Sequence, residues 1–355
     1  MSVPTRSQQN YRDRDIFRDA KDRIYVTLGH IQPKDGIIST LKYVPDRKGK
    51  WQSQGIRYRR VFSNNVESVT GGQGILPDDY YDDSHFGIPL LKFPKHEVTQ
   101  YYSPEKRLES LLETGCNDPL EQTAVELSQI LHDNLDIPFN HLGVTGSIAW
   151  HAHNPGFSDI NLNIHGYEWS WILEQGYSEL VEENTELQMK KGNLWDDSIA
   201  RAAKRIPVLR SSALKRLFTR RTQLMYNGHG VTIMPVLYSS ESPIRYGSEK
   251  YYTLDLVISD FKIKSSRYGI FFPAIYDVTG EVQYETQILS INRLLIYDGT
   301  FRGLFHPEDQ IQVCGTLQRV ESSEQKSPFH QIMIGTKSGS GREFIKLTRP
   351  SQSYL

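Results

Sequence analysis

The segment that most constrains the fold lies in the middle of the chain and combines a short apolar strand with a small-residue turn. Phe139 to Val144 reads as the strand, and Thr145-Gly146-Ser147 forms the turn that ends it. The apolar residues Ile148-Ala149-Trp150 then predict a short helix, which Asn154-Pro155-Gly156 breaks. This order predicts a strand, a tight turn and a helix packed as one unit.

The residues after that break alternate in polarity. From Asp159 to Ile164 every second residue is apolar, which predicts a half-buried strand. The alternation places Asp159, Asn161 and Asn163 on the same face of that strand. The segment therefore presents a row of polar side chains close in sequence to the Gly-Ser turn.

A glycine turn and a polar row of this kind suit phosphate chemistry. Gly146 lets the backbone approach a polyphosphate closely, and the Ser147 hydroxyl with the N–H groups of a helix start can bind its oxygens. Carboxylates at positions i and i+2 of a strand point the same way and can hold Mg²⁺ ions that bridge phosphates. Asp159 offers such a carboxylate, whereas Asn161 offers an amide.

The two motifs together resemble a known signature. Gly143-Val144-Thr145-Gly146-Ser147 followed by Ser158-Asp159-Ile160-Asn161-Leu162 resembles that of the nucleotidyltransferase superfamily, the group related to DNA polymerase beta. The whole chain also resembles archaeal predicted nucleotidyltransferases of unassigned substrate. The resemblance implies an NTP substrate, a Mg²⁺ cofactor and an acceptor such as RNA, DNA or protein. It assigns Gly146, Ser147 and Ser158 to nucleotide binding, and Asp159 and Asn161 to catalysis and to the metal.

The chain departs from this signature at the acids. Asn161 brings no negative charge and cannot take a proton. The superfamily uses a third acid on a later strand, but Val231 to Leu237 contains no carboxylate, and Asp255 is the nearest candidate for a catalytic role. Two functions stay open: a transferase that moves a nucleotidyl group, or a degenerate homologue that binds nucleotide or nucleic acid as a scaffold.

The length of 355 residues predicts more than one domain, and the patterns divide the chain into three. We expect an α+β protein with a β-rich domain over residues 1–103, a nucleotidyltransferase-like mixed sheet with helices over 104–260 and a small, OB-like β-barrel over 261–355. Helix starts at Ser103-Pro104 and Asp118-Pro119 and helical sequence from Trp169 to Met225 support the middle assignment.

A basic stretch offers a second route to phosphate. It predicts a helix face that receives a triphosphate or a nucleic-acid backbone, with Lys215 and Arg216 as nucleotide-binding candidates, although a merely solvated face explains it as well. Its cationic residues are Lys204, Arg205, Arg210, Lys215, Arg216, Arg220 and Arg221. Arg57, Arg59 and Arg60 on an N-terminal strand extend the same path, with alternation separating Arg59 from Arg60. In the C-terminal barrel, Tyr297, Phe301 and Phe305 serve either to stack bases or as core.

The bulk composition restricts the setting. Lys and Arg number 41 and Asp and Glu number 42, so the net charge of −1 gives no long-range field that would attract nucleic acid. The two cysteines, Cys116 and Cys314, cannot build a disulfide framework or a thiolate zinc site. No apolar run approaches the ~18 residues of a membrane span. We expect a cytoplasmic protein without a membrane partner.

Overall fold

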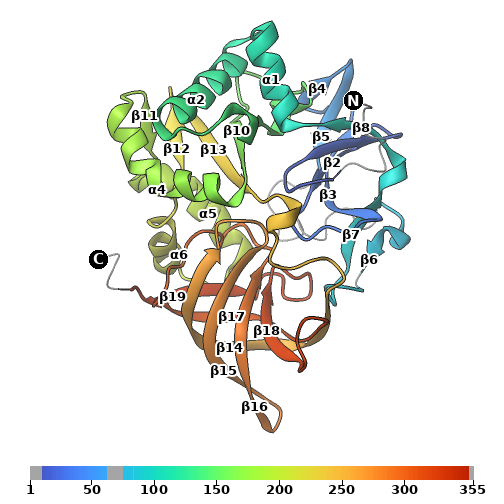
Figure 1. Ribbon diagram of the computed structural model, residues 1–355, viewed down its shortest axis with the longest axis vertical. Helices are drawn as coiled ribbons and strands as arrows, with labels where there is room; N and C mark the ends of the chain where they lie inside the picture. Colours follow the sequence, from blue (N-terminus) through green and yellow to red (C-terminus); the bar gives the residue numbers. More distant parts are fainter. Residues whose placement is uncertain (1–9, 62–74, 83, 352–355) are drawn as a thin grey trace.

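The computed structural model describes residues 10–61, 75–82 and 84–351. The protein is of the α+β type, with more strand than helix, and its strands form three separate sheets of eight, five and six strands. The three sheets follow one another along the chain, and Figure 1 shows them arranged around the centre of the molecule.

The N-terminal sheet has the order β4-β5-β3-β2-β1-β8, with β7 and β6 added on β3. Its strand β3 is central because β2 pairs with one edge, while β5 and β7 share the other. A core rich in aromatic residues, including Phe17, Tyr25 and Phe93, lies on one face. The strands are β1 (Ile16–Asp19), β2 (Ile24–Thr27), β3 (Gly36–Pro45), β4 (Trp51–Ser53), β5 (Ile56–Arg60), β6 (Tyr81–Asp82), β7 (Leu90–Pro94) and β8 (Val98–Tyr102).

The middle sheet is mixed and has the order β11-β12-β13-β10-β9. Strand β10 lies between β9, which is antiparallel to it, and β13, which is parallel. Helices α1, α2 and α4 pack against this sheet. The strands are β9 (Leu142–Val144), β10 (Ile160–His165), β11 (Leu187–Met189), β12 (Leu224–Tyr226) and β13 (His229–Val236), and the helices are α1 (Pro104–Thr114), α2 (Pro119–Leu135), α3 (Gly146–Ala149) and α4 (Tyr167–Glu183).

The helix starts of this region follow from capping. The Ser103 hydroxyl accepts a hydrogen bond from the Lys106 backbone N–H at 3.3 Å, and Asp118 accepts from Leu120 and Glu121 at 2.8 and 3.1 Å. A proline follows each cap at the first helical position, where its missing N–H costs nothing. The two helix starts predicted from sequence are confirmed.

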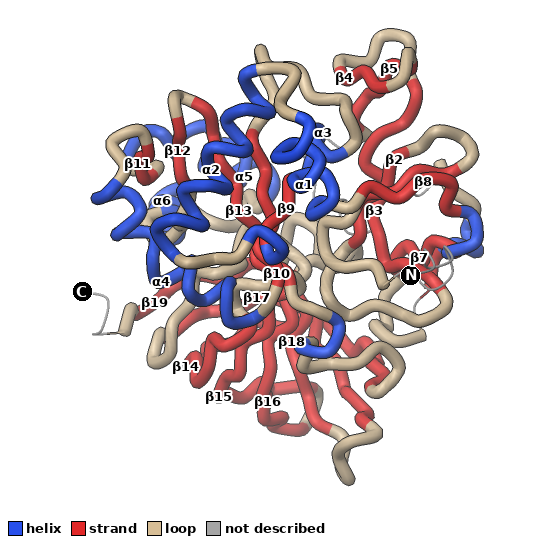
Figure 2. The backbone as a smooth tube through the Cα atoms, turned by 45° about the horizontal axis from the view of Figure 1, so that its top comes forward, coloured by secondary structure: helices blue, strands red, loops and turns tan. Residues whose placement is uncertain are grey.

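The third sheet is strongly curled. Strand β14 pairs with β15 at one end and with β17 along most of its length, so the path β14-β15-β16-β18-β17 returns to β14. Its only parallel pair among the described strands is β16 with β18. Figure 2 shows β14, β15 and β16 side by side in this sheet. The strands are β14 (Glu249–Tyr268), β15 (Ala274–Tyr284), β16 (Gln287–Ile296), β17 (Gln310–Ser322), β18 (Phe329–Ile334) and β19 (Phe344–Arg349).

Two features differ from the sequence interpretation. The stretch Trp169 to Met225, expected to be helical, contains the short strands β11 and β12 besides α4, α5 (Asp196–Arg205) and α6 (Ser211–Phe218). The segment Leu254 to Ile258, assigned above to the middle domain, belongs to β14 of the third sheet. Helices α5 and α6 bury their apolar faces in the core of that third sheet, so they bridge the two regions.

Trp150 joins the N-terminal sheet to the middle region. It follows α3 directly, is 1% exposed and contacts Tyr43 and Tyr58 with ring centroids 5.1 and 5.0 Å away. Its backbone carbonyl accepts a hydrogen bond from Ser53 at 2.9 Å. The predicted motif helix is therefore held in place by aromatic packing from another sheet.

We predict that Trp150→Ala lowers the free energy of unfolding by about 3–5 kcal/mol, because it leaves a large cavity between two sheets. Urea unfolding, monitored by far-UV circular dichroism and not by tryptophan fluorescence, measures the loss of unfolding free energy. Phe157→Ala is the control, since Phe157 is 48% exposed and touches only the rim of this cluster through Trp51. A loss in Trp150→Ala no larger than in the control contradicts the proposed role.

Candidate anion-binding site

The Gly-Ser turn and the polar row of β10 meet in the structure. Gly146 has a φ of +66°, and a Cβ atom built on it would lie 2.8 Å from the Asn161 side-chain nitrogen. The Thr145 backbone N–H donates to the Asn161 carbonyl at 2.9 Å. Only glycine tolerates both this backbone conformation and this closeness. The turn and the row predicted from sequence are therefore brought together.

The strand register sets which residue of β13 lies beside Asn161. Strands β10 and β13 are parallel, and their register pairs Asn161 with Thr232. A Cβ atom built on Gly230 would lie 3.5 Å from an Asp159 carboxylate oxygen. Asp255 lies on β14 in the third sheet, where its carboxylate accepts from the Leu256 N–H at 2.7 Å. Asp255, the nearest candidate for a catalytic role in the sequence, therefore lies in a different sheet from Asn161.

These donors do not fit a pair of Mg²⁺ ions. Asp159 supplies one exposed carboxylate, while Asn161 and Thr232 supply neutral oxygens. The Lys190 ammonium is close enough to Asp159 for the two charges to interact. A divalent pair needs several carboxylates to offset its charge. A two-metal mechanism therefore finds no adequate ligand set here.

Another group of ligand atoms lies elsewhere, in Asp118, Glu121 and His153, whose atoms are within 4.8 Å of one another. Each already has a structural task. Asp118 caps α2 and lies 2.6 Å from the His153 ring nitrogen, and Glu121 forms a buried ion pair with Arg107. The Arg107 guanidinium supplies the positive charge that a cation would bring. We interpret this group as a capping and ion-pair network.

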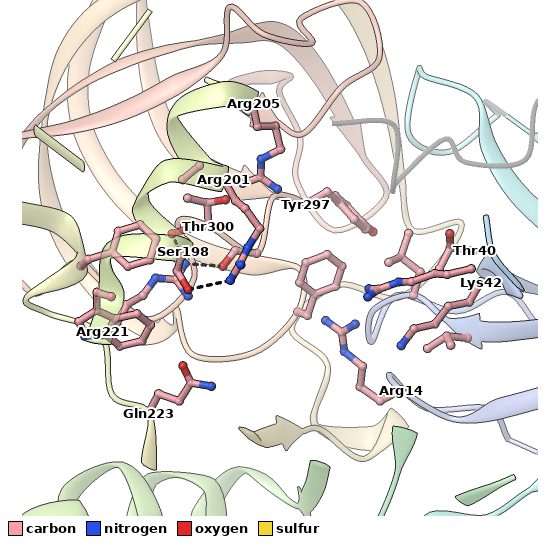
Figure 3. Close-up of a pocket in the computed structure, with 18 of the residues that line it drawn as sticks. Arg14, Thr40, Lys42, Ser198, Arg201, Arg205, Arg221, Gln223, Tyr297 and Thr300 are labelled. Atoms are coloured by element: carbon pink, nitrogen blue, oxygen red, sulfur yellow. Dashed lines mark hydrogen bonds between the residues drawn. The ribbon is translucent and has the colours of Figure 1, made fainter. Parts of the chain in front are cut away.

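The most distinctive site is a cavity of about 490 Å³ between the N-terminal sheet, helix α5 with the segment after α6, and loops of the third sheet. Figure 3 shows Arg14, Thr40 and Lys42 on one side and Ser198, Arg201 and Arg221 on the other. The N-terminal sheet supplies the first wall, α5 and the segment after α6 supply the second, and Phe272, Tyr297 and Thr300 come from loops of the third sheet. Its size is in the range of small-molecule sites.

The charge of this cavity is one-sided. Its described lining contains six cationic side chains and no carboxylate. Two of the six have an acidic partner just outside the lining: Arg14 with Asp13 at 3.3 Å and Arg205 with Asp298 at 2.9 Å. The other four have no ion pair within the described part of the chain. The six are Arg14, Lys42, Arg60, Arg201, Arg205 and Arg221.

Burial and mutual repulsion perturb these cations. Burial, together with the neighbouring Arg60 and Arg14 charges, lowers the pKa of Lys42 to about 7. Burial, Arg302 and Arg205 lower the pKa of Arg221 to about 10, so this side chain remains charged at neutral pH. A group whose charged form is disfavoured in this way gains stability from a bound anion. The cavity is therefore built to receive negative charge.

Aromatic rings lie beside the cations. The Arg14 guanidinium is 5.2 Å from the Phe272 ring centroid, and the Arg221 guanidinium is 4.9 Å from that of Phe218. Both rings line the cavity. A planar cation held on a ring can also stack with a ligand's aromatic base. The cavity thus combines phosphate-binding charge with surfaces for a flat ring.

Hydrogen bonds connect the cavity to the β10 row at two points. The Gln223 side-chain amide, which lines the cavity, donates to the Thr232 hydroxyl at 3.3 Å. The Arg14 carbonyl accepts from the Thr145 hydroxyl at 3.2 Å, directly before the Gly146 turn. The cavity and the row are therefore neighbouring parts of one region.

The remaining predicted nucleotide-binding residues lie apart from the cavity lining. Ser158 accepts a hydrogen bond from the Asn154 N–H at 2.9 Å and closes the preceding turn, and Ser147 is buried. Lys215 and Arg216 are exposed on α6 and do not line the cavity. From the basic stretch, Arg205 and Arg221 reach it instead, and Arg60 alone does so among the three N-terminal arginines.

Sequence reasoning missed Arg14, Lys42 and Arg201. Arg201 lies on α5, in a helix whose basic residues continue into the predicted basic stretch, so a wider window would have included it. Arg14 and Lys42 carry no local signal. Tyr297, Phe301 and Phe305 of the third sheet are buried, as the core interpretation expects, although Tyr297 also borders the cavity.

Comparisons with family models, with curated proteins and with solved structures find no match for this chain. None of the helices in residues 10–61, 75–82 and 84–351 has both the length and the apolar composition of a membrane span. The site must therefore be interpreted from its own geometry.

We predict that inorganic tripolyphosphate raises the thermal midpoint of unfolding. At a hundred times its Kd, a ligand of the folded state adds about 2.7 kcal/mol. Arg201→Gln and Arg60→Gln should each reduce this shift, because each removes an unpaired cation from the lining. Lys215→Gln and Arg216→Gln are matched charge controls outside it. An equal reduction in the controls would show that the effect is only non-specific screening.

Proposed function

We propose that this protein is a nucleotide-binding member of the nucleotidyltransferase-like fold class. More specifically, we propose that it binds a nucleoside triphosphate in the cavity and offsets the phosphate charge with arginine and lysine rather than with a metal pair. This is the degenerate-homologue alternative of the two functions that the sequence leaves open.

The arrangement of the middle sheet supports the fold assignment. The order β13-β10-β9, with the Gly146 turn against Asn161, agrees with a signature whose Gly-Ser turn faces an acidic strand pair. In this proposal, Asn161 and Thr232 stand for the second and third acids of that signature, because the two residues pair across β10 and β13. Fold likeness alone does not give an activity, so the function depends on the site itself.

The observation that carries the proposal is the cavity with six cations and no lining carboxylate among the described residues. Arginine forks match phosphate oxygens and remain charged at any physiological pH. Where a two-metal enzyme brings acids to hold Mg²⁺, this site presents the positive charge directly. The Phe272 and Phe218 rings, with their stacked guanidinium groups, suit the base.

The third sheet supports a nucleic-acid ligand as an extension of this proposal. A five-strand path that closes on β14, with β16 and β18 parallel, agrees with an OB-like barrel. Such barrels bind oligonucleotides through their loops. Phe272, in the loop between β14 and β15, faces the shared cavity.

We predict that nucleoside triphosphates bind more tightly than tripolyphosphate by roughly 5- to 100-fold, because base stacking adds about 1–3 kcal/mol. Calorimetry at fixed salt measures both ligands. Removing Mg²⁺ with a chelator should preserve or strengthen binding, since free nucleotide carries more negative charge. Phe272→Leu should reduce the difference in affinity between nucleoside triphosphates and tripolyphosphate. Binding that requires Mg²⁺ and disappears in Asp159→Ala would contradict the proposal and favour an enzyme.

A second candidate, nucleotidyl transfer itself, is favoured by the retained Asp159 beside an intact Gly146 turn. We predict that the double replacement Asn161→Asp with Thr232→Asp introduces Mg²⁺-dependent pyrophosphate release from an NTP, because it restores acids at both paired positions. A coupled pyrophosphate assay detects the product. Asn154→Asp, on the exposed turn before β10, is the control for added charge.

Pyrophosphate release by the wild-type protein decides between nucleotide binding and nucleotidyl transfer. Pyrophosphate release by the wild type at a rate that Asp159→Ala abolishes would establish the transferase. Release only in the double variant is the result expected of a binding protein that lost its acids. A folded double variant that binds nucleotide but releases no pyrophosphate would show that the row lacks catalytic geometry.

A further inference from the structure

Lys42 differs from the other cations of the cavity. It lies on β3, the central strand of the N-terminal sheet, and is half-buried. Figure 3 shows its amine directed into the cavity from the same side as Arg14. Within residues 10–61, 75–82 and 84–351 the amine has no carboxylate partner, and its nearest ring, Tyr43, is 5.9 Å away.

The surroundings of Lys42 favour its neutral form. The charged groups that act on it are Arg14 and Arg60, both positive, and burial removes water from the ammonium. The pKa of about 7 means that a large share of this amine is unprotonated at neutral pH. An ordinary exposed lysine, with a pKa of ~10.4, has roughly one free amine in a thousand there. Lysines made neutral by neighbouring cations act as nucleophiles.

We propose that Lys42 is a modification site, acylated by small acyl phosphates that enter the cavity. The inference goes beyond the proposed function and does not depend on nucleotide binding. The amine nitrogen attacks the carbonyl carbon and forms an amide, the bond from carbon to the phosphate oxygen breaks, and the amine proton leaves with the departing hydrogen phosphate. No oxidant, metal or further reactant is needed.

The cavity selects this class of reagent by its charge. Arg60 and Arg14, on the same side as Lys42, attract the phosphate and stabilise it as the leaving group. Before the reagent binds, burial and the same two guanidinium groups favour the neutral amine, so one arrangement both attracts the electrophile and supplies the nucleophile. A neutral acylating reagent meets the same neutral amine but is not attracted by the two guanidinium groups.

Acylation changes the cavity in a defined way. The amide removes the positive charge of the protonated Lys42, and the acyl group occupies space within the cavity of about 490 Å³. Modified protein should therefore bind tripolyphosphate several-fold more weakly. The modification would couple the anion affinity of the cavity to the supply of acyl phosphate.

The test is incubation of the full chain with acetyl phosphate, followed by peptide mapping by mass spectrometry. Acetylation of Lys42 should exceed that of Lys215 at least tenfold at pH 7.5, and Lys215 serves as internal control because it is exposed and outside the cavity. The Lys42 rate should rise through pH 7 and then level off. Equal rates at the two lysines, or a Lys42 rate that still climbs steeply above pH 9, overturns the proposal.

Two further experiments separate attraction of the reagent by the cavity's charge from the intrinsic reactivity of the Lys42 amine. Arg60→Gln should slow acetylation of Lys42 by acetyl phosphate more than acetylation by the neutral N-hydroxysuccinimidyl acetate at pH 9.5. Tripolyphosphate should protect Lys42 and leave Lys215 unchanged. Equal slowing of both reagents in folded Arg60→Gln, or a lack of protection, contradicts acylation guided by the cavity. Lys42→Arg keeps the charge and should show no acetylated peptide at that position.

Discussion

The repulsion between like charges held close together in one cavity is the constraint on which the rest of this structure depends. The cavity gathers six cations with no carboxylate in its described lining, and two unshielded charges at short range repel by several kcal/mol in a protein environment. Apolar packing around it opposes this repulsion. The buried faces of α5 and α6 lie in the core of the third sheet, and Trp150 packs into the N-terminal sheet. The folded chain thus holds a net positive site that an anion can relieve.

Under the proposed function, the absence of acids beside Asp159 and the cations of the cavity have a common physical explanation. A row with three carboxylates needs divalent ions before a triphosphate can approach, since otherwise negative charges face each other. In the proposed assignment, the neutral Asn161 and Thr232 stand where two of those charges would be, and Lys190 lies near the remaining one at Asp159. Phosphate can then approach without a metal and meet Arg201 and Arg221. In this proposal, neutral side chains in place of carboxylates and cations in the cavity both make the electrostatic potential at a bound phosphate more positive.

Local patterns predicted the local structure well. The caps at Ser103 and Asp118 and the Gly146 turn depend on neighbouring residues, and each is present. Strand β10 is present too, but Asn163 and His165 are buried together with its apolar residues, so the expectation of a half-buried strand is wrong. The cavity depends instead on which strands meet across the molecule. Lys42 and Arg201 are more than a hundred positions apart, and no periodicity relates them.

The pairing of strands that are distant in sequence was the other feature that the local sequence did not predict. The strand β14 starts at Glu249, so Asp255 belongs to the third sheet, a fact set by pairing with β17 rather than by its own sequence. Likewise Thr232 becomes the partner of Asn161 only through the parallel register of β10 and β13. Register is decided by the packing of a whole sheet, since a shift of one residue moves every side chain to the other face.

The segment before β1 links the cavity to all three sheets. The Arg14 carbonyl accepts from Thr145 at the turn, its guanidinium lies on Phe272 of the third sheet, and Asp13 accepts from the Gly29 N–H of the N-terminal region at 2.7 Å. A ligand held by Arg14 therefore touches a residue already fixed from three directions. Such a residue loses little conformational freedom on binding, so more of its interaction with an anion remains as affinity. The one-sided charge is thus carried by a rigid frame, which is what a specific site requires and a merely basic surface lacks.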